Sequence, residues 1–562
     1  MSAITILILG LIGLCFGWFI YSKYVAIHIF KFDPDFKTPA HELEDGVDYV
    51  PTNKYVLWGH HFTSVAGAAP IVGPAIAVYW GWVPAVLWVV FGSIFFAGVH
   101  DMGALWASVR HKGKSIGALS ENVIGPRTRA LYMVVVFLVL LMVNSVFGVV
   151  IANAFVSTPS AVLPAWSAIA VALVIGQLLH RNMMKLGVLT AIGVAVLYVS
   201  IYAGSEIPLS LPSGLPGLGI PATWIVILFV YAAIASMLPV WMLLQPRDFI
   251  NGMQLAVGLL LLYGAVLISG PEITAPAFNN QLAEGTPSLL PLLFVTIACG
   301  AVSGFHGIVA SGTTSKQLDK EPDARFVGYF AALGEGSLAL ITIIAVTGVA
   351  LAASPEAWHE TYSHFGAGSV GAFITGGANL IENGWGISAG LASTLLATMV
   401  ALFAGTTMDS GVRLQRYIIQ EWGEIYNIKW ITNGVVATGI AVGTCLVLAF
   451  GAGGTEGNGG MTIWPLFGST NQILAGMTLL VLSVMLIKKK RPALVTLIPM
   501  VFVLCMSALA STIIFMQFLR AGNYLLMAIN AVVLITSLLV VLESLSVISK
   551  ERAKQRAENQ SS

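Results

Sequence analysis

Long apolar runs follow one another along the whole chain, and they constrain its fold more than any other feature. A helix needs about 20 residues to cross the roughly 30 Å hydrocarbon core of a bilayer. Fifteen runs meet this requirement, with approximate limits 3–29, 56–80, 84–109, 130–155, 162–179, 186–203, 221–243, 249–270, 289–311, 327–353, 386–410, 430–450, 463–487, 493–519 and 524–547. Only 9% of the residues are charged, against about 25% in soluble domains. The sequence therefore predicts an all-α, multi-pass membrane protein with about 15 transmembrane helices.

Several other classes of protein find no support in the sequence. The run 4–21 lacks a basic segment before it and a small-residue cleavage site after it, so we interpret it as a retained span and not as a signal peptide. No basic patch with interleaved aromatic residues predicts a nucleic-acid partner, and no zinc-peptidase pattern predicts an enzyme. We expect neither a cofactor nor a metal site, because the four cysteines are dispersed through apolar runs: Cys15, Cys299, Cys445 and Cys505.

The charges in the connectors predict an orientation. If alternate connectors lie on the same side, that side receives all of the 27 Lys and Arg residues except Arg520. The opposite connectors hold glutamates instead: Glu206, Glu272, Glu284, Glu356, Glu360, Glu382 and Glu456. Lys and Arg collect in cytoplasmic loops. We therefore expect the N-terminus outside the cell and the C-terminus in the cytoplasm.

The stretch GHHFTSVAGAAPIVGP at 59–74 is poor material for a continuous helix, although it lies inside an apolar run. Glycine and proline weaken or break a helix, and irregular backbone survives in a membrane only where it faces protein or a watery cavity. We expect a break near Gly67 and Pro70. The positive end of one half-helix would suit a substrate carboxylate, and the free carbonyls of the other a coupling ion. The alternative is a helix that is only kinked, with glycines for close packing.

The ninth run repeats part of this pattern. His61 and Gly67 are six residues apart, and His306 and Gly312 have the same spacing within SGFHGIVASGTT. In the predicted topology the two runs cross in opposite directions. Each is followed by a helix with one acidic residue and then by a long connector, 110–129 in the first case and 354–385 in the second. Two similar units of opposite orientation are typical of inverted-repeat secondary transporters.

Three carboxylates, Asp101, Glu335 and Asp409, fall inside predicted spans, where ionisable groups are functional candidates. Removing a carboxyl group from water favours its protonated form, so such a group can carry a proton. The alternative is a structural ion pair: Asp101 with His100 or a facing arginine, and Asp409 with Arg413 four residues later.

Two groups of candidate site residues follow. The substrate-binding candidates are His60, His61, Gly67, Pro70, Ser303, Gly304 and His306. The coupling-ion candidates are Asp101, Glu335, Thr406, Thr407 and Asp409, where the two hydroxyls would join freed carbonyls around a sodium ion. Adjacent residues on a helix point about 100° apart, so His60 and His61 are not expected to face one cavity. Each histidine has the alternative of a purely structural hydrogen bond.

Two polar pairs lie in or beside spans. Asn471 and Gln472 lie about a third of the way into a span, where an unpaired amide would be costly. Arg247 and Asp248 stand at a cytoplasmic helix start and could form a salt bridge, but we favour simple capping of the helix by Asp248.

Four separated motifs carry a resemblance: WGHHFTSVAGAAPIVGP, LQPRDF, TTMDSGVRLQRYIIQE and IWPLFGSTNQILA. In this order they resemble the signatures of the carbon starvation protein A family, from about residue 50 to 475. The resemblance implies a transporter of the bacterial inner membrane, associated with peptide uptake and, in some members, with pyruvate uptake by proton symport. It also implies distant kinship with the amino acid–polyamine–organocation superfamily and its five-plus-five inverted-repeat fold, in which the first helix of each repeat is broken.

Under that fold we expect a division of the chain into an N-terminal span and loop, repeat 1, two inserted spans, repeat 2, and a terminal hairpin with tail: 1–55, 56–203, 204–288, 289–487 and 488–562. An alternative starts the second repeat at 221, where Pro239 could supply the break.

The expected function is proton-coupled symport of small carboxylates or short peptides across the lipid bilayer. A sodium-coupled peptide or amino acid symporter is the alternative. A channel or a membrane nutrient sensor is the alternative of another class.

Overall fold

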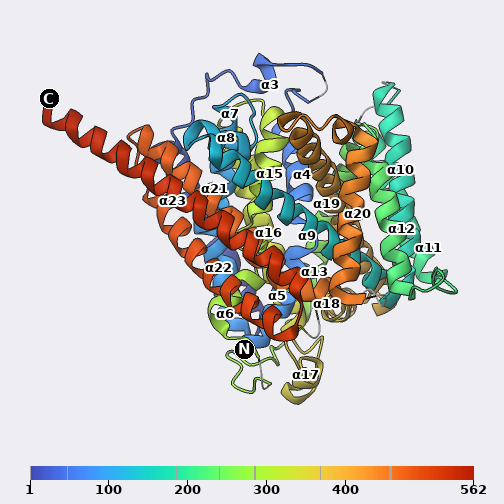
Figure 1. The fold of residues 1–562 in the computed structure, drawn as a ribbon. Coiled ribbons are helices and arrows are strands. Elements are labelled where there is room, and N and C mark those ends of the chain that lie inside the picture. The colour runs from blue at the N-terminus through green and yellow to red at the C-terminus, as the bar shows by residue number, and fades with distance from the viewer. Residues whose placement is uncertain are drawn as a thin grey trace.

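The computed structural model describes residues 2–46, 48–181, 183–184, 186–239, 241–283, 286–366, 369–454 and 459–561. Within these ranges the chain is almost entirely helical, with three isolated β-bridges and no β-strand (Figure 1). Three residues used in the charge argument, Lys185, Glu284 and Glu456, lie outside the described residues. The predicted all-α, multi-pass class is confirmed.

Among the described residues, thirteen helical segments are long and apolar enough to cross a membrane. Four are composite: Ala3–Phe30, which contains α1 (Ala3–Phe16); Trp82–Val109, which contains α6 (Trp82–Gly92) and α7 (Gly98–Val109); Pro159–His180, which contains α10 (Val162–His180); and Arg325–Thr347, which contains α16 (Phe330–Thr347). The other nine are α9 (Pro126–Ser157), α11 (Leu186–Glu206), α12 (Ile220–Met237), α13 (Leu244–Ser269), α19 (Ala389–Ile425), α20 (Gly434–Gly453), α21 (Gly459–Lys488), α22 (Leu494–Ala521) and α23 (Tyr524–Ser561).

The two remaining predicted spans, 56–80 and 289–311, are both interrupted. The first consists of α4 (Lys54–Ala66) and α5 (Ala69–Ala77), and its two halves bend by 45°. The second consists of α14 (Leu289–Thr296) and α15 (Gly304–Gly312), each too short to cross alone. The bent pair brings the number of candidate spans to 14, and the second pair accounts for the fifteenth predicted one.

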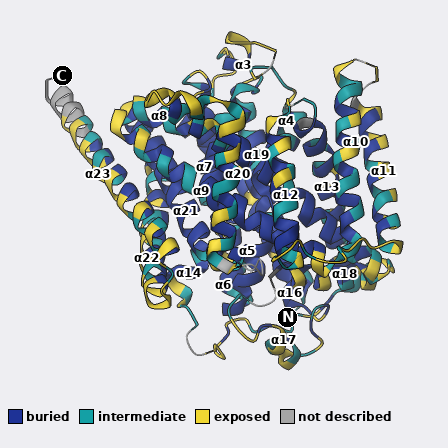
Figure 2. Cartoon of the chain, turned by 45° about the vertical axis from the view of Figure 1, so that its right-hand side comes forward, coloured by how far each residue is buried: buried dark blue, intermediate teal, exposed yellow. Residues whose placement is uncertain are grey.

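Burial divides the helices into an inner and an outer set (Figure 2). The apolar stretch of α21 is completely buried, and those of α9 and α16 are mostly buried. The outer helices α1, α11 and α23 expose many aliphatic side chains, as expected of helices that face lipid. Any polar chemistry within the membrane must therefore take place around the inner helices.

Both long connectors contain helices of their own. The connector 110–129 contains α8 (Ile116–Val123), and 354–385 contains α17 (Pro355–Thr361) and α18 (Ser369–Trp385). α18 packs against α5, α13, α16 and α19. The chain begins beside α17, and its C-terminal end lies on the opposite side of the bundle (Figure 1).

The packing of the inner helices is paired. α9 lies against α19, and each of these two helices also packs against both α12 and α20. In the same way α13 packs against α4, and α21 packs against α15. α10 and α11 pack against each other at the edge of the bundle, at the right of Figure 1.

Candidate functional site

The interruption of the first span lies at Gly67, as predicted. α4 ends at Ala66, and Gly67 has φ 52° and ψ −154°, a conformation that is essentially restricted to glycine. Pro70 stands in the first turn of α5, where no backbone N–H is needed for the helix. The alternative of a helix that is only kinked is therefore wrong, because the backbone already leaves the helical conformation at Gly67, before Pro70 and Pro74.

We expect Gly67→Ala to destabilise the protein by about 1–3 kcal/mol, because alanine is strained in this backbone conformation. A β-carbon at 67 would also lie 2.7 Å from Phe147 Cε2 and 2.8 Å from Thr407 Oγ1. Thermal unfolding of the purified protein measures the effect. Gly439→Ala in α20 is the control, because a β-carbon there meets nothing within 4 Å. An equal melting temperature for the two variants would contradict the prediction.

The interruption of the second span lies between α14 and α15, and two amides of α21 each bind one of its freed backbone groups. Asn471 Oδ1 accepts a hydrogen bond from the backbone N–H of Phe305 at 2.9 Å. Gln472 Nε2 donates to the carbonyl of Phe294 at 2.6 Å. The costly buried amides noted in the sequence are thus the partners of the broken helix.

Ser303 and Gly304 join α15 to α21. Asn471 Nδ2 donates to Ser303 Oγ at 3.0 Å. Gly304 lies directly against the backbone of α21, since a β-carbon there would be 2.6 Å from the nitrogen of Ala475. Both predicted substrate-binding residues are therefore engaged in packing and hydrogen bonding within the protein.

Four ionisable side chains from three helices form a buried chain, which we call the Asp101 cluster. Asp101 Oδ1 lies 2.7 Å from His100 Nδ1, and Asp101 Oδ2 lies 2.8 Å from His306 Nδ1. On the other side of the ring, His306 Nε2 lies 3.1 Å from Glu335 Oε2, at ion-pair distance but outside hydrogen-bond angles. The members come from α7, α15 and α16, and each is at most 1% exposed.

The Asp101 cluster has the composition of a proton-transfer chain. An imidazole with a carboxylate on each ring nitrogen can accept a proton on one side and release one on the other. Glu335 Oε1 and His100 Nε2 have no hydrogen-bond partner among the described residues. The alternative pairing of Asp101 with His100 is therefore present, but it is only half of the arrangement. The sequence analysis did not predict which residue His306 contacts.

The two adjacent histidines of α4 face different surroundings, as their helical spacing predicts. His61 is fully buried, and its Nδ1 lies 2.9 Å from Thr314 Oγ1. His60 is partly exposed, and its Nδ1 lies 3.0 Å from Asp248 Oδ2.

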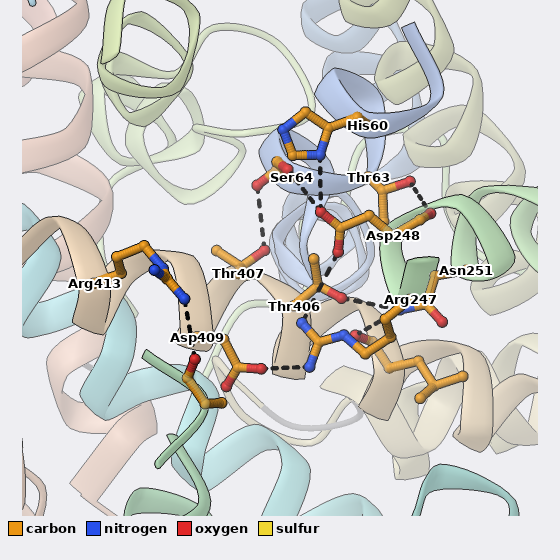
Figure 3. Close-up of polar contacts among 12 residues, drawn as sticks. His60, Thr63, Ser64, Arg247, Asp248, Asn251, Thr406, Thr407, Asp409 and Arg413 are labelled. Atoms are coloured by element: carbon orange, nitrogen blue, oxygen red, sulfur yellow. Dashed lines mark hydrogen bonds and ion pairs between the residues drawn. The ribbon is translucent and has the colours of Figure 1, made fainter. Parts of the chain in front are cut away.

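A second buried group of charges surrounds Arg247, and we call it the Arg247 cluster (Figure 3). Arg247 Nη1 forms an ion pair with Asp409 Oδ2 and donates to the hydroxyl of Tyr231 at 2.6 Å. The Tyr231 hydroxyl donates to the same carboxylate oxygen at 2.7 Å. On the other side, Arg247 Nη2 lies 3.9 Å from Asp248 Oδ1. The cluster therefore joins α12, α13 and α19 and, through His60, α4.

Two interpretations of the sequence are wrong here. Asp409 does not pair with Arg413, whose Nη2 donates instead to the carbonyls of Ala235 and Leu238. Asp248 does not cap α13, because that helix begins at Leu244 and Asp248 already lies inside it. Both interpretations assumed partners close in sequence, whereas Asp409 contacts Arg247 of α13 and Asp248 contacts His60 of α4.

Of the two threonines of α19, one approaches the first break. Thr407 Oγ1 lies 3.5 Å from the carbonyl of Ser64 and close to Gly67. Thr406 Oγ1 instead accepts a hydrogen bond from Asn251 Nδ2 of α13 at 2.9 Å. The predicted approach of both hydroxyls to the break is therefore correct only for Thr407 (Figure 3).

Three cavities reach the candidate residues. One of about 110 Å³ is lined by Ser64, Arg413 and Lys316, among others, and another of about 390 Å³ is mostly apolar. Both include His60. A third cavity of about 30 Å³ is lined by Arg247 and Tyr231. Among the described residues, no group of three or more His, Cys, Asp or Glu side chains could hold a metal ion.

The predicted site residues thus fall into separate places. Asp101, Glu335 and His306 lie together, whereas His60 and Asp409 belong to the Arg247 cluster. The sequence analysis missed Arg247 and Tyr231 as members of a buried network. The signal for Arg247 was its position in the quoted motif LQPRDF, four residues into a long apolar helix.

Comparisons with known proteins point to one family. The profile described as "Carbon starvation protein CstA" matches residues 2–356 and 345–510. "Peptide transporter CstA" of Campylobacter jejuni is 32% identical, over 90% of this chain and 79% of its own. The same name is carried by a Bacillus subtilis protein that is also 32% identical, with 89% of each chain covered. "Pyruvate/proton symporter BtsT" of Escherichia coli is 32% identical, over 86% of this chain and 78% of its own.

Solved structures show a more distant likeness. The crystal structure of MhsT in complex with L-phenylalanine matches 88% of this chain and 99% of its own, with a TM-score of 0.47 and 12% identity. That of a manganese transporter mutant from Eremococcus coleocola matches 91% and 99%, with a TM-score of 0.45 and 10% identity.

Proposed function

The chain belongs to the carbon starvation protein CstA family of membrane transport proteins, and we propose that it is a proton-coupled symporter that brings small carboxylates such as pyruvate, or short peptides, into the cell. Relatives that match most of its length are named for peptide transport and for pyruvate/proton symport. The two substrates share a carboxylate.

The observation that carries the proposal is the Asp101 cluster. Its two carboxylates and the imidazole between them are buried, hydrogen-bonded or ion-paired, and drawn from three helices. A protonated His306 would carry two N–H groups, one in the hydrogen bond to Asp101 and the other at ion-pair distance from Glu335. Binding from outside and release inside then require only that access to the cluster alternates, as in secondary transporters.

We also propose an orientation and a repeat alignment. The charge asymmetry supports a cytoplasmic C-terminus and an external N-terminus in the bacterial inner membrane. The paired packing supports α4–α5, α9, α12 and α13 as counterparts of α14–α15, α19, α20 and α21. In this alignment the inserted spans are α10 and α11, in place of the spans at 204–288 expected from the sequence.

Transport by purified protein in proteoliposomes tests the function. Pyruvate and alanyl-alanine are offered separately, with an imposed proton gradient, an imposed sodium gradient, or neither. Accumulation of either compound above its external concentration in response to the proton gradient is the expected result. Movement that only equalises the two concentrations under every gradient is the behaviour of a channel and would contradict symport.

Sodium coupling is the second candidate, and one observation favours it. Thr407 Oγ1 and the carbonyl of Ser64 converge at the break of the first span, where freed carbonyls can hold a cation. If a sodium gradient drives accumulation and a proton gradient does not, the coupling ion is sodium and Thr407 and Ser64 become the candidate coupling site.

A further inference from the structure

We propose that Arg247 is the residue that binds the substrate's carboxylate, so that the substrate site includes the Arg247 cluster and is not confined to the two helix breaks. The inference rests on the proposed function, from which it takes the chemical class of the substrate.

The first observation is an unused edge of a buried guanidinium. Arg247 is 2% exposed, and its Nη1 serves Asp409 and Tyr231. Its Nε and Nη2 have no hydrogen-bond partner among the described residues. This edge presents two parallel N–H donors, the arrangement that binds a carboxylate through both oxygens. Buried donors without partners are rare in proteins, and here they point to a ligand that supplies the acceptors.

The charges that face Arg247 are compatible with reversible binding of a ligand. Asp248 Oδ1 has no hydrogen-bond partner among the described residues and remains 3.9 Å from Nη2, too far for a hydrogen bond. A substrate carboxylate would take the position nearer to Nη2 and compete with Asp248. Asp248 also contacts His60 and Ser64 of α4. Substrate binding at Arg247 would therefore change the contacts of Asp248 with α4, the first half of the broken helix.

The remaining charged and titratable groups around the cluster are accounted for. Asp409 and Tyr231 hold the opposite edge of the guanidinium, and the side chain of Arg413 is turned to backbone carbonyls. His60 is the member of the cluster that lines the cavities of about 110 and 390 Å³.

The cluster lies between cavities that approach it from different ends of the bundle. The 110 Å³ cavity includes Lys316 and Gln317, which follow the C-terminal end of α15. The cavity beside Arg247 includes Ile151 and Phe155, near the C-terminal end of α9. The second cavity measures only about 30 Å³, room for no more than a few water molecules. A substrate would reach Arg247 only when this cavity widens, which suits a site that opens alternately to the two faces.

Paired ligands test the role of the carboxylate. Binding of pyruvate is compared with that of pyruvamide, and binding of alanyl-alanine with that of its C-terminal amide, on the purified full-length protein. We expect the wild type to prefer the carboxylate roughly 10- to 100-fold, the range of a charged hydrogen bond. The double variant Arg247→Gln/Asp409→Asn removes both members of the ion pair, so that neither is left buried without the other, and Asp248 keeps its contact with His60. It is expected to bind acid and amide equally weakly.

Two further variants separate binding from folding. Arg325→Gln is the matched control, since Arg325 bonds to Ser22 and to the carbonyl of Trp18, away from the cluster; it should keep the full preference. Gly405→Ala adds a methyl group beside Arg247, because Gly405 lines the 30 Å³ cavity and a β-carbon there meets nothing within 4 Å. It should weaken carboxylate binding without lowering the melting temperature.

The outcomes distinguish the two proposals. If the wild type transports its substrate and the folded double variant keeps the preference for the carboxylate, the inference about Arg247 is overturned while the proposed function stands. If the wild type neither binds nor transports pyruvate or the dipeptide, the proposed function fails and the inference fails with it. Loss of the preference in the double variant and its retention in Arg325→Gln support the inference.

Discussion

Asp101→Asn is expected to abolish proton-driven accumulation of substrate while leaving exchange of substrate between the two sides of the membrane. Asparagine has nearly the same size as the protonated carboxyl group, but it cannot release a proton. For symport with one proton, a gradient of one pH unit supports about tenfold accumulation. We therefore expect up to about tenfold accumulation by the wild type and none by the variant, measured in proteoliposomes with an acidic exterior.

Glu356→Gln provides the control for this experiment, because Glu356 is an exposed carboxylate in the first turn of α17, outside the spans. It should accumulate substrate as the wild type does. Undiminished accumulation by Asp101→Asn would exclude Asp101 as the coupling group. Glu335, the carboxylate on the other side of His306, would then be the next residue to test.

Asp409→Asn alone is expected to lower the free energy of unfolding by about 3–5 kcal/mol, since it leaves the guanidinium of Arg247 buried without its ion-pair partner. Arg247→Gln alone should cost a similar amount. The double variant should lose clearly less than the sum of the two single losses. Unfolding in a mixed detergent titration, followed by tryptophan fluorescence, gives the three values.

An exposed ion pair sets the scale for that measurement. Glu42 Oε1 lies 3.7 Å from Lys112 Nζ at the surface, and Glu42→Gln should cost less than about 1 kcal/mol. Additive losses in the Arg247 and Asp409 variants would mean that the two side chains do not stabilise each other.

The spans and their breaks could be predicted because both depend on local sequence. Apolar length decides whether a helix can cross the bilayer, and glycine at 67 permits a backbone conformation that other residues avoid. The buried carboxylates could be named for the same reason: Asp101 and Glu335 stand out in apolar runs. The helix α18 was missed because its 17 residues mix polar and apolar side chains, which makes it a helix of the bundle surface rather than a span.

The partners of the buried groups could not be predicted, because they depend on how distant helices pack. His306 meets Asp101, which is 205 positions away. For Asp409 the helical spacing favoured Arg413, yet packing against α13 brings Arg247 to it from 162 positions away. Spacing along one helix gives only the near candidates, and a buried charge takes whichever partner the tertiary structure offers.

The backbone groups of the two breaks differ in their side-chain hydrogen bonds, and this difference should affect the rates of amide exchange. In the second break the N–H of Phe305 is held by Asn471 of the fully buried α21. At the first break, the only side chain that reaches the backbone among the described residues is Thr407, at 3.5 Å. Deuterium should therefore enter the backbone around Gly67 and Ala68 rapidly and the N–H of Phe305 slowly. Labelling times would then identify the first broken helix as the half of the molecule that opens.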